Sequence, residues 1–322
     1  MEKENLEWCD LAKGIGIFHV VFAHSFLDEY METYILVGRA YKIIYSFHMS
    51  LFFLIAGMLC RYHITKYRNQ AYSALIGKKM KQLYVPYLLY SLMIQCVIFT
   101  LERVPRVAEI LHGKGYHTEF SFSALISLVA CIDPMDKHIW FIFTLFFIYA
   151  ITYRLIRYLP KKSYLVFSLV FYGIVSYFLE YKYRTRINYA KVDIFVRTVK
   201  FHLVYSMGYH MLPWVQKTIA TGKEVSMILP FIVTILVSIN DTIYRIIFVS
   251  TGYALLDKCF DFYMYFIGTG FVIGIASLIQ KGKEHFVIDK LLVWIRKIGK
   301  NSFTIYLWHQ PILVTGASMV CY

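Results

Sequence analysis

Apolar runs of about twenty residues recur along the whole of this 322-residue chain. A helix of that length crosses the hydrocarbon core of a bilayer, and only helices or closed barrels satisfy every backbone polar group there. The composition agrees, since 58% of the residues are hydrophobic and 17% are charged, with a mean hydropathy of +0.53. The sequence therefore predicts an all-α fold, a polytopic membrane helix bundle that forms one domain over residues 1–322.

We expect about ten membrane-spanning helices. Ten alternating spans would leave two basic stretches, 182–200 and 281–300, on the outside, so an arrangement of nine, in which 164–180 does not cross, is the alternative. A further apolar segment, 122–132, is too short to cross and is expected to be re-entrant or interfacial. The ten expected spans are 11–27, 43–60, 83–101, 139–157, 164–180, 197–213, 226–240, 243–257, 262–280 and 302–320.

The charges of the first two loops orient the helices. Residues 61–82 hold six Lys and Arg and no acid, whereas residues 28–42 hold three acids and two bases. Because basic loops stay in the cytoplasm, residues 61–82 are expected inside, and so is the N-terminus. The formal net charge of +14 is concentrated between apolar runs, which indicates topology and contact with anionic lipid headgroups rather than nucleic acid.

The first expected span carries a line of polar side chains. Lys13 and His24 are eleven positions apart, which returns them to one face of a helix, roughly 16 Å apart along its axis. Asp10 falls close to the same line. Such a line is costly against lipid, so it should face the protein interior.

His24 is the strongest candidate for chemistry. A single histidine inside a helix bundle is most often structural, but Asp28 lies four residues on, on the same face, where it can orient the ring. His48 and His138 stand at the outer ends of their expected helices, and imidazoles that converge at one depth indicate proton transfer or a metal. A metal is the weaker alternative, because no HxxxH or HxH pair occurs and carboxylates are sparse.

Four basic residues form a candidate anion site on the cytoplasmic side. Their charges would bind a phosphate-bearing donor by charge-assisted hydrogen bonds. The same residues also fit a snorkelling lysine at a helix end and an ordinary topology signal, and these interpretations are compatible. The four are Lys13, Arg61, Lys78 and Lys81.

Aromatic residues and a histidine near other helix ends are further candidates. Trp140 and Tyr306 fit an interfacial belt as well as a cavity wall. His309 lies about two turns into the last expected span, where a structural and a site-lining role are equally supported. The sequence has no GxSxG elbow, no phosphate loop and no dinucleotide fingerprint.

Four stretches, taken in order, resemble the acyltransferase 3 family of bacterial integral-membrane acyltransferases, which O-acylate cell-surface sugars. They are 10–25, with Lys13 and His24 in the family's pattern of a basic residue and a histidine separated by ten residues, then 47–57 (FHMSLFFLIAG), 138–141 (HIWF) and 302–309 (SFTIYLWH). The resemblance implies about ten helices, a cytoplasmic N-terminus, an acyl donor such as acetyl-CoA on the cytoplasmic side, and a sugar hydroxyl as acceptor. Many members have Arg where this chain has Lys13, which keeps the charge but loses the bidentate fork.

We therefore expect a membrane O-acyltransferase, with acetyl as the expected group, that moves an acyl group from acyl-CoA to a hydroxyl of a cell-surface or exported saccharide. His24 would act as general base or would carry the acyl group itself, with the base favoured, and Asp28 would orient it. No metal and no tightly bound cofactor are expected, and the partners are the saccharide acceptor and membrane lipids. The remaining candidates would line the cavity: Asp10, Ser25, His48, His138, Trp140, Tyr306 and His309.

The alternative is a transporter or flippase for a lipid-linked saccharide or small anion, which would use the same cavity without covalent chemistry. Transporters often show internal repeats, and the sequence shows none. A structural scaffold is disfavoured by the histidines inside the expected spans. The expected location is a bacterial cytoplasmic membrane, which the chain crosses many times.

Overall fold

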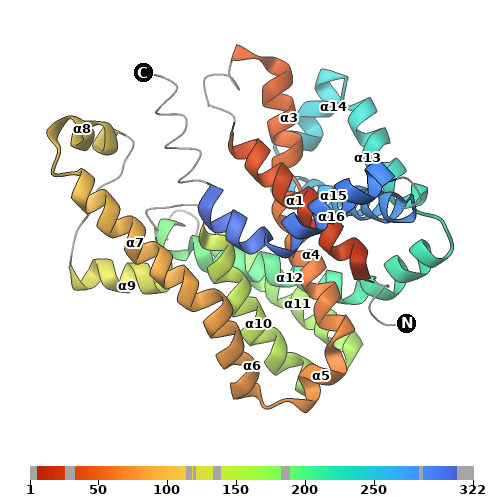
Figure 1. The fold of residues 1–322 in the computed structure, drawn as a ribbon, viewed down its shortest axis with the longest axis horizontal. Helices are drawn as coiled ribbons and strands as arrows, with labels where there is room; N and C mark the ends of the chain where they lie inside the picture. The colour runs from red at the N-terminus through yellow and green to blue at the C-terminus, as the bar shows by residue number, and fades with distance from the viewer. Residues whose placement is uncertain are drawn as a thin grey trace. The chain divides into compact units, whose positions relative to one another are not determined.

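The computed structural model describes residues 6–25, 33–113, 118, 121–132, 139–182, 189–282 and 286–309, and every regular element within them is helical, as predicted (Figure 1). The chain forms two compact units. Unit 1 comprises Met1–Met58 and Gly208–Tyr322, and unit 2 comprises Leu59–Met207. The expectation of a single domain over 1–322 stays a prediction.

Five helices are long and apolar enough to cross a bilayer. A further pair, Val192–Ala220 and Val225–Val237, passes the same test together but is bent by 105°. These helices support a helical membrane protein, although the expected count of ten is not reached in the described residues. The five are Ile35–Tyr62, Tyr72–Leu101, Trp140–Tyr158, Lys162–Leu179 and Ala254–Lys281.

The expected span 243–257 is wrong. The structure has a short helix there, α14 (Asp241–Phe248), and a new helix, α15 (Ala254–Lys281), after a break. The Asn240 side chain caps α14 by accepting from two backbone N–H groups, and Gly252 in the break has a φ of +81°. Eight residues rise only about 12 Å, which is too short to cross a bilayer.

Three other expected segments can be compared with the helices of the structure. The segment 164–180 is part of a helix long enough to cross, so its length does not favour the nine-span alternative. The segment 281–300, expected as a basic loop, contains a helix, α16 (Phe286–Lys300). Of the last expected span, residues 302–309 are helical and the rest lies outside the described residues.

The short apolar segment is a helix, α9 (Phe122–Ala130), capped by the Ser121 hydroxyl. Four of its apolar side chains follow helical spacing and are exposed, as an interfacial segment requires. Helix α9 packs against α7 (Val85–Leu101), and the Tyr87 hydroxyl of α7 donates a hydrogen bond to the Leu128 carbonyl of α9. The four exposed side chains are Phe122, Leu125, Ile126 and Val129.

Unit 1 is built on a close approach of α1 (Glu7–His24) to α16 (Figure 1). A Cβ added at Gly14 would collide with the Ile295 backbone carbonyl, and one added at Gly299 would collide with the Asp10 carbonyl. An ion pair of 2.7 Å between Glu7 and Arg296 adds a polar contact. The N-terminal half of α1 is therefore held by backbone-to-backbone packing that only glycine permits.

The two glycines of a GxxxG in α15, Gly270 and Gly274, let this helix pack closely against α13 (Val225–Val237). A Cβ at Gly270 would lie 3.2 Å from the Met227 carbonyl oxygen. At the corner before α13, the buried Glu224 accepts a hydrogen bond of 3.1 Å from Ser277 and pairs with Lys281. The bend is thus fixed to α15 by both packing and charge.

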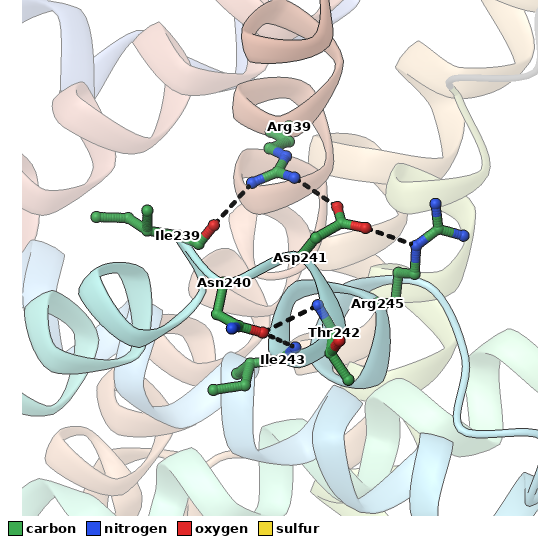
Figure 2. A network of polar contacts seen from close by, with 7 residues as sticks. All are labelled: Arg39, Ile239, Asn240, Asp241, Thr242, Ile243 and Arg245. Atoms are coloured by element: carbon green, nitrogen blue, oxygen red, sulfur yellow. Dashed lines mark hydrogen bonds and ion pairs between the residues drawn. The ribbon is translucent and has the colours of Figure 1, made fainter.

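A polar network joins α3 (Ile35–Tyr45) to α14 (Figure 2). The Arg39 guanidinium donates to Asp241 Oδ1 at 2.6 Å and lies 4.5 Å from the centroid of the Tyr244 ring. Arg245 Nε donates to Asp241 Oδ2 at 3.0 Å. The hydrogen bond and the charge of Arg245, and then the charge of Arg39, hold the pKa of the Asp241 carboxyl below its ordinary value.

Unit 2 is organised around α10 (Trp140–Tyr158), which packs on α5, α6, η2 and α11. Arg68 Nε donates to the Ile156 carbonyl at 3.1 Å, and Arg157 donates to the carbonyls of Tyr67 and Gln70. The helices of this unit and the two shared with unit 1 are α4 (His48–Tyr62), α5 (Ile64–Asn69), α6 (Tyr72–Lys79), the π-helix η2 (Met80–Tyr84), α7, α8 (Pro105–Gly113), α9, α10, α11 (Lys161–Val175), η4 (Ser176–Lys182) and α12 (Tyr189–Ala220).

The contact between α1 and α16 predicts opposite effects of one methyl group at two glycines. Gly299→Ala should destabilise the protein by about 1–3 kcal/mol, because the added Cβ overlaps the Asp10 backbone. Gly173→Ala adds the same atom where no other atom lies within 4 Å, so it should be neutral or slightly stabilising. Thermal unfolding in detergent measures both, and equal midpoints for the two variants would contradict the packing described.

The network at Asp241 predicts a pH-dependent stability. Because the folded-state pKa is lowered, the stabilisation is present above the unfolded-state pKa of about 3.9 and is lost as the pH falls through the folded-state value. Wild type should therefore unfold at a higher temperature than Asp241→Asn at neutral pH, and the difference should shrink as the pH falls toward 3. A difference that stays constant over this range would show that the carboxylate charge contributes nothing.

Candidate active site

His24 is the last residue of α1 and is half-buried in unit 1. Its ring centroid lies 5.5 Å from that of Tyr45 and 5.1 Å from that of His309. The Tyr45 hydroxyl lies 3.1 Å from His24 Nδ1 and 3.3 Å from Nε2, so it can hydrogen-bond one ring nitrogen at a time. The hydroxyl donates to an unprotonated nitrogen or accepts from a protonated one.

Two further histidines complete this group, and their hydrogen bonds define their tautomers. His48 Nδ1 lies 3.1 Å from the Ile44 carbonyl oxygen, and His309 Nδ1 lies 2.7 Å from the Tyr306 carbonyl oxygen. Because a carbonyl only accepts, Nδ1 carries the hydrogen in each ring, and Nε2 of the neutral ring is the basic atom. Both side chains are buried. We call His24, Tyr45, His48 and His309 the His24 cluster.

The chain places these side chains together by simple helical spacing. Tyr45 ends α3 and His48 begins α4 three residues later, so the two rings share a face with centroids 4.6 Å apart. Tyr306 and His309 are also three residues apart, and their ring centroids lie 5.6 Å apart. Within unit 1, the ends of three helical segments therefore converge on His24.

Other predicted residues of unit 1 lie away from this group. Lys13 pairs with Asp10 at 2.6 Å, eleven residues before His24 on the same helix. Ser25 is exposed, and its hydroxyl donates to the Phe22 carbonyl of its own helix at 2.7 Å. Asp28 lies outside the described residues. The roles of these residues stay predictions.

The remaining candidates belong to unit 2. Trp140 packs on Phe201, with ring centroids 5.3 Å apart, and the Arg197 guanidinium lies 5.0 Å from the Trp140 ring centroid. Arg61 is half-buried near the end of α4, whereas Lys78 and Lys81 are exposed. His138 lies outside the described residues. The donor-binding role of the basic residues stays a prediction.

Two residues near the His24 cluster, Tyr45 within it and His19 beside it, are not predicted by the sequence patterns. Tyr45 is one of 28 tyrosines, and its spacing to His48 was the only signal available. His19 is half-buried with its ring centroid 5.8 Å from that of Phe47, and its buried Nδ1 has no hydrogen-bond partner among the described residues. Among those residues, no group of three His, Cys, Asp or Glu side chains is placed to hold a metal ion.

Comparison with known proteins decides the family. The family model described as "Acyltransferase domain", of the acyltransferase 3 family, matches residues 6–321, essentially the whole chain. The chain belongs to the acyltransferase 3 family. No curated protein and no solved structure matches it. Membership confirms the resemblance drawn from the four motifs and supports an acyltransferase in a multi-pass membrane protein.

In an acyltransferase, the His24 cluster can accept and pass on a proton. A half-buried imidazole beside a hydroxyl can take a proton from an attacking group. The Tyr45 hydroxyl can hold the ring orientation during that transfer.

This geometry predicts a positioning role for Tyr45. Tyr45→Phe removes the hydroxyl but keeps the ring, so it should lower the turnover of acyl transfer about two- to tenfold and shift its pH profile, with KM for the donor unchanged. Tyr41→Phe is the matched control, since Tyr41 lies on the same helix with its ring centroid 4.1 Å from that of Tyr45. Steady-state kinetics of both variants test this, and equal turnover in the two would remove Tyr45 from the mechanism.

Proposed function

We propose that this protein is a membrane O-acyltransferase that transfers an acyl group, with acetyl the expected one, from acyl-CoA to a hydroxyl of a cell-surface or exported saccharide. The observation that carries the proposal is the His24 cluster, an imidazole hydrogen-bonded to Tyr45 and beside His309, in a chain of the acyltransferase 3 family. An acyl transfer to a hydroxyl needs a general base near neutral pH, which an imidazole supplies.

The proposed step is a direct transfer with His24 as base. A ring nitrogen of His24 takes the proton of the sugar hydroxyl while the hydroxyl oxygen attacks the thioester carbonyl carbon. The new C–O ester bond forms, the C–S bond breaks, and the thiolate of CoA leaves and takes up a proton. Tyr45 holds the ring in place, and Asp28, which follows His24 by four residues, would orient the cationic form.

An alternative within the same site has His24 carry the acyl group. The imidazole nitrogen would then attack the thioester first, and the sugar hydroxyl would attack the acyl-imidazole in a second step. His24 is half-buried and its ring contacts the Tyr45 hydroxyl. This setting favours the role of general base, because direct transfer does not require space for an acyl group bonded to the ring.

Basic side chains would bind the phosphates of the donor. Lys13, Arg61, Lys78 and Lys81 are the proposed contacts for its phosphates. Lys13 is paired with Asp10, so a phosphate at Lys13 would compete with that carboxylate. A cytoplasmic N-terminus is proposed from the acid-free loop 61–82, and a bacterial cytoplasmic membrane is proposed from the family. The family comparison gives no support to the alternative of a transporter or flippase.

His24→Ala should abolish acylation of the surface saccharide, by roughly 10²- to 10⁴-fold, because it removes the general base. His210→Ala is the matched control, since His210 is a half-buried histidine of unit 1 on α12, outside the His24 cluster. Mass spectrometry of the saccharide from cells that express each variant gives the readout, and membrane fractions show equal protein amounts.

Three outcomes of this experiment separate the functions. A saccharide that lacks only the acyl group in His24→Ala supports the proposed enzyme. Loss of the whole polymer would instead indicate transport, and acylation at the wild-type level would sink the mechanism.

A further inference from the structure

A second group of polar side chains lies in unit 2, and the proposed mechanism does not use it. Lys79 ends α6 and is half-buried, with its ammonium nitrogen 3.9 Å from the centroid of the Tyr149 ring. Within the described residues, Lys79 makes no hydrogen bond and no ion pair, so this cation–π contact is what holds its charge. Its neighbours Lys78 and Lys81, the two lysines predicted to bind the donor, are exposed.

The Tyr149 ring belongs to a group of tyrosines from three helices. The centroid of the Tyr149 ring lies 5.5 Å from that of Tyr153 and 5.7 Å from that of Tyr205. The ring centroids of Tyr153 and Tyr67 are 4.9 Å apart. We call these four tyrosines and Lys79 the Lys79 cluster. It combines one cation with several hydroxyl groups.

Two of the hydroxyls are buried without a satisfactory partner. Tyr153 is 1% exposed and Tyr205 is fully buried, and neither hydroxyl makes a hydrogen bond of good geometry to a described residue. Tyr67 and the Cys60 thiol lie close to Tyr153 and Tyr205 respectively, but neither is placed for such a bond. Because buried hydroxyls are nearly always hydrogen-bonded, the cluster lacks a group that would complete it.

The chemistry of the cluster identifies the missing group. An ammonium only donates hydrogen bonds, and a tyrosine hydroxyl donates most readily, so the partner must be an acceptor with several oxygens. The segments that build the cluster, 59–101, 139–163 and 196–207, contain no Asp or Glu. The field there therefore favours an anion, and no carboxylate of these segments competes with it.

We propose that the Lys79 cluster binds a phosphate group, with the Lys79 ammonium and the hydroxyls of Tyr153 and Tyr205 as its donors. The phosphate would belong to the acyl-CoA donor, an assignment that rests on the proposed function, or to a phospholipid headgroup. The flexible stem of Lys79 allows the ammonium to turn from the Tyr149 ring to a phosphate oxygen while the ring still shields one side of the charge.

Binding of CoA to the purified full-length protein, measured by calorimetry in detergent, tests the donor assignment. Lys79→Gln should weaken CoA binding roughly ten- to a hundredfold, because a charge-assisted contact to phosphate is lost, and Lys79→Arg should retain most of it. Lys162→Gln is the matched control, since Lys162 is an exposed lysine of the same unit, on α11, and it should bind CoA like wild type.

Two conservative variants keep the inference testable if Lys79→Gln does not fold. Tyr153→Phe and Tyr205→Phe remove only the hydroxyls, and each should weaken CoA binding about two- to tenfold. The same variants should raise the unfolding temperature of the ligand-free protein, because each removes a buried hydroxyl without a partner. A structural role of these hydroxyls would instead lower that temperature and leave CoA binding unchanged.

Native mass spectrometry of the same variants tests the lipid assignment. If Lys79→Gln loses a retained phospholipid while CoA binding is unchanged, the phosphate is that of a headgroup. If CoA binding falls and the lipid is retained, it is that of the donor. Wild-type CoA binding together with wild-type lipid retention in Lys79→Gln and both Phe variants would overturn the inference.

These outcomes are separable from a failure of the proposed function. A protein that binds CoA through Lys79 but acylates no saccharide would refute the proposed function and leave this site standing. Acylation that depends on His24, with CoA and lipid binding indifferent to Lys79, would refute this site and leave the proposed function standing.

Discussion

Backbone contact between α1 and α16, at Gly14 and Gly299, is the constraint on which unit 1 depends. At these points the backbones approach so closely that even a methyl group would overlap a carbonyl. These contacts and the Glu7–Arg296 ion pair hold the N-terminal half of α1 and so set the direction of the helix. His24, the last residue of that helix, is consequently carried to a defined place beside Tyr45 and His309.

Polar side chains inside this apolar protein are handled in two different ways. In the His24 cluster, the His24 ring faces the Tyr45 hydroxyl, and Nδ1 of His48 and of His309 each face a carbonyl, so hydrogen bonds select tautomers and orient the rings. In the Lys79 cluster, an ammonium rests on an aromatic face and two buried hydroxyls are left incomplete. The arrangement of the His24 cluster suits proton exchange, and that of the Lys79 cluster suits the binding of an anionic ligand.

Much of the candidate site could be predicted from short-range patterns, and its completion could not. The spacing of Lys13 and His24 on one helix follows from helical geometry, and both motif histidines, His48 and His309, lie in the described cluster. Tyr45 was missed because one tyrosine among 28 carries no signal of its own. Lys79 was missed because a run of three lysines within four residues does not reveal which one turns inward.

The sequence by itself determined the class of this protein: its apolar runs require helices that satisfy their own backbone in a membrane, and its ordered motifs place it in the acyltransferase 3 family. Only the tertiary structure decided where helices end and which side chains meet. It replaced the expected span 243–257 with the short α14 and the break before α15, and it turned the expected loop 281–300 into α16. The physical reason is that hydropathy averages over many residues, whereas a cap, a glycine contact or a ring beside an ammonium depends on single atoms brought together from distant parts of the chain.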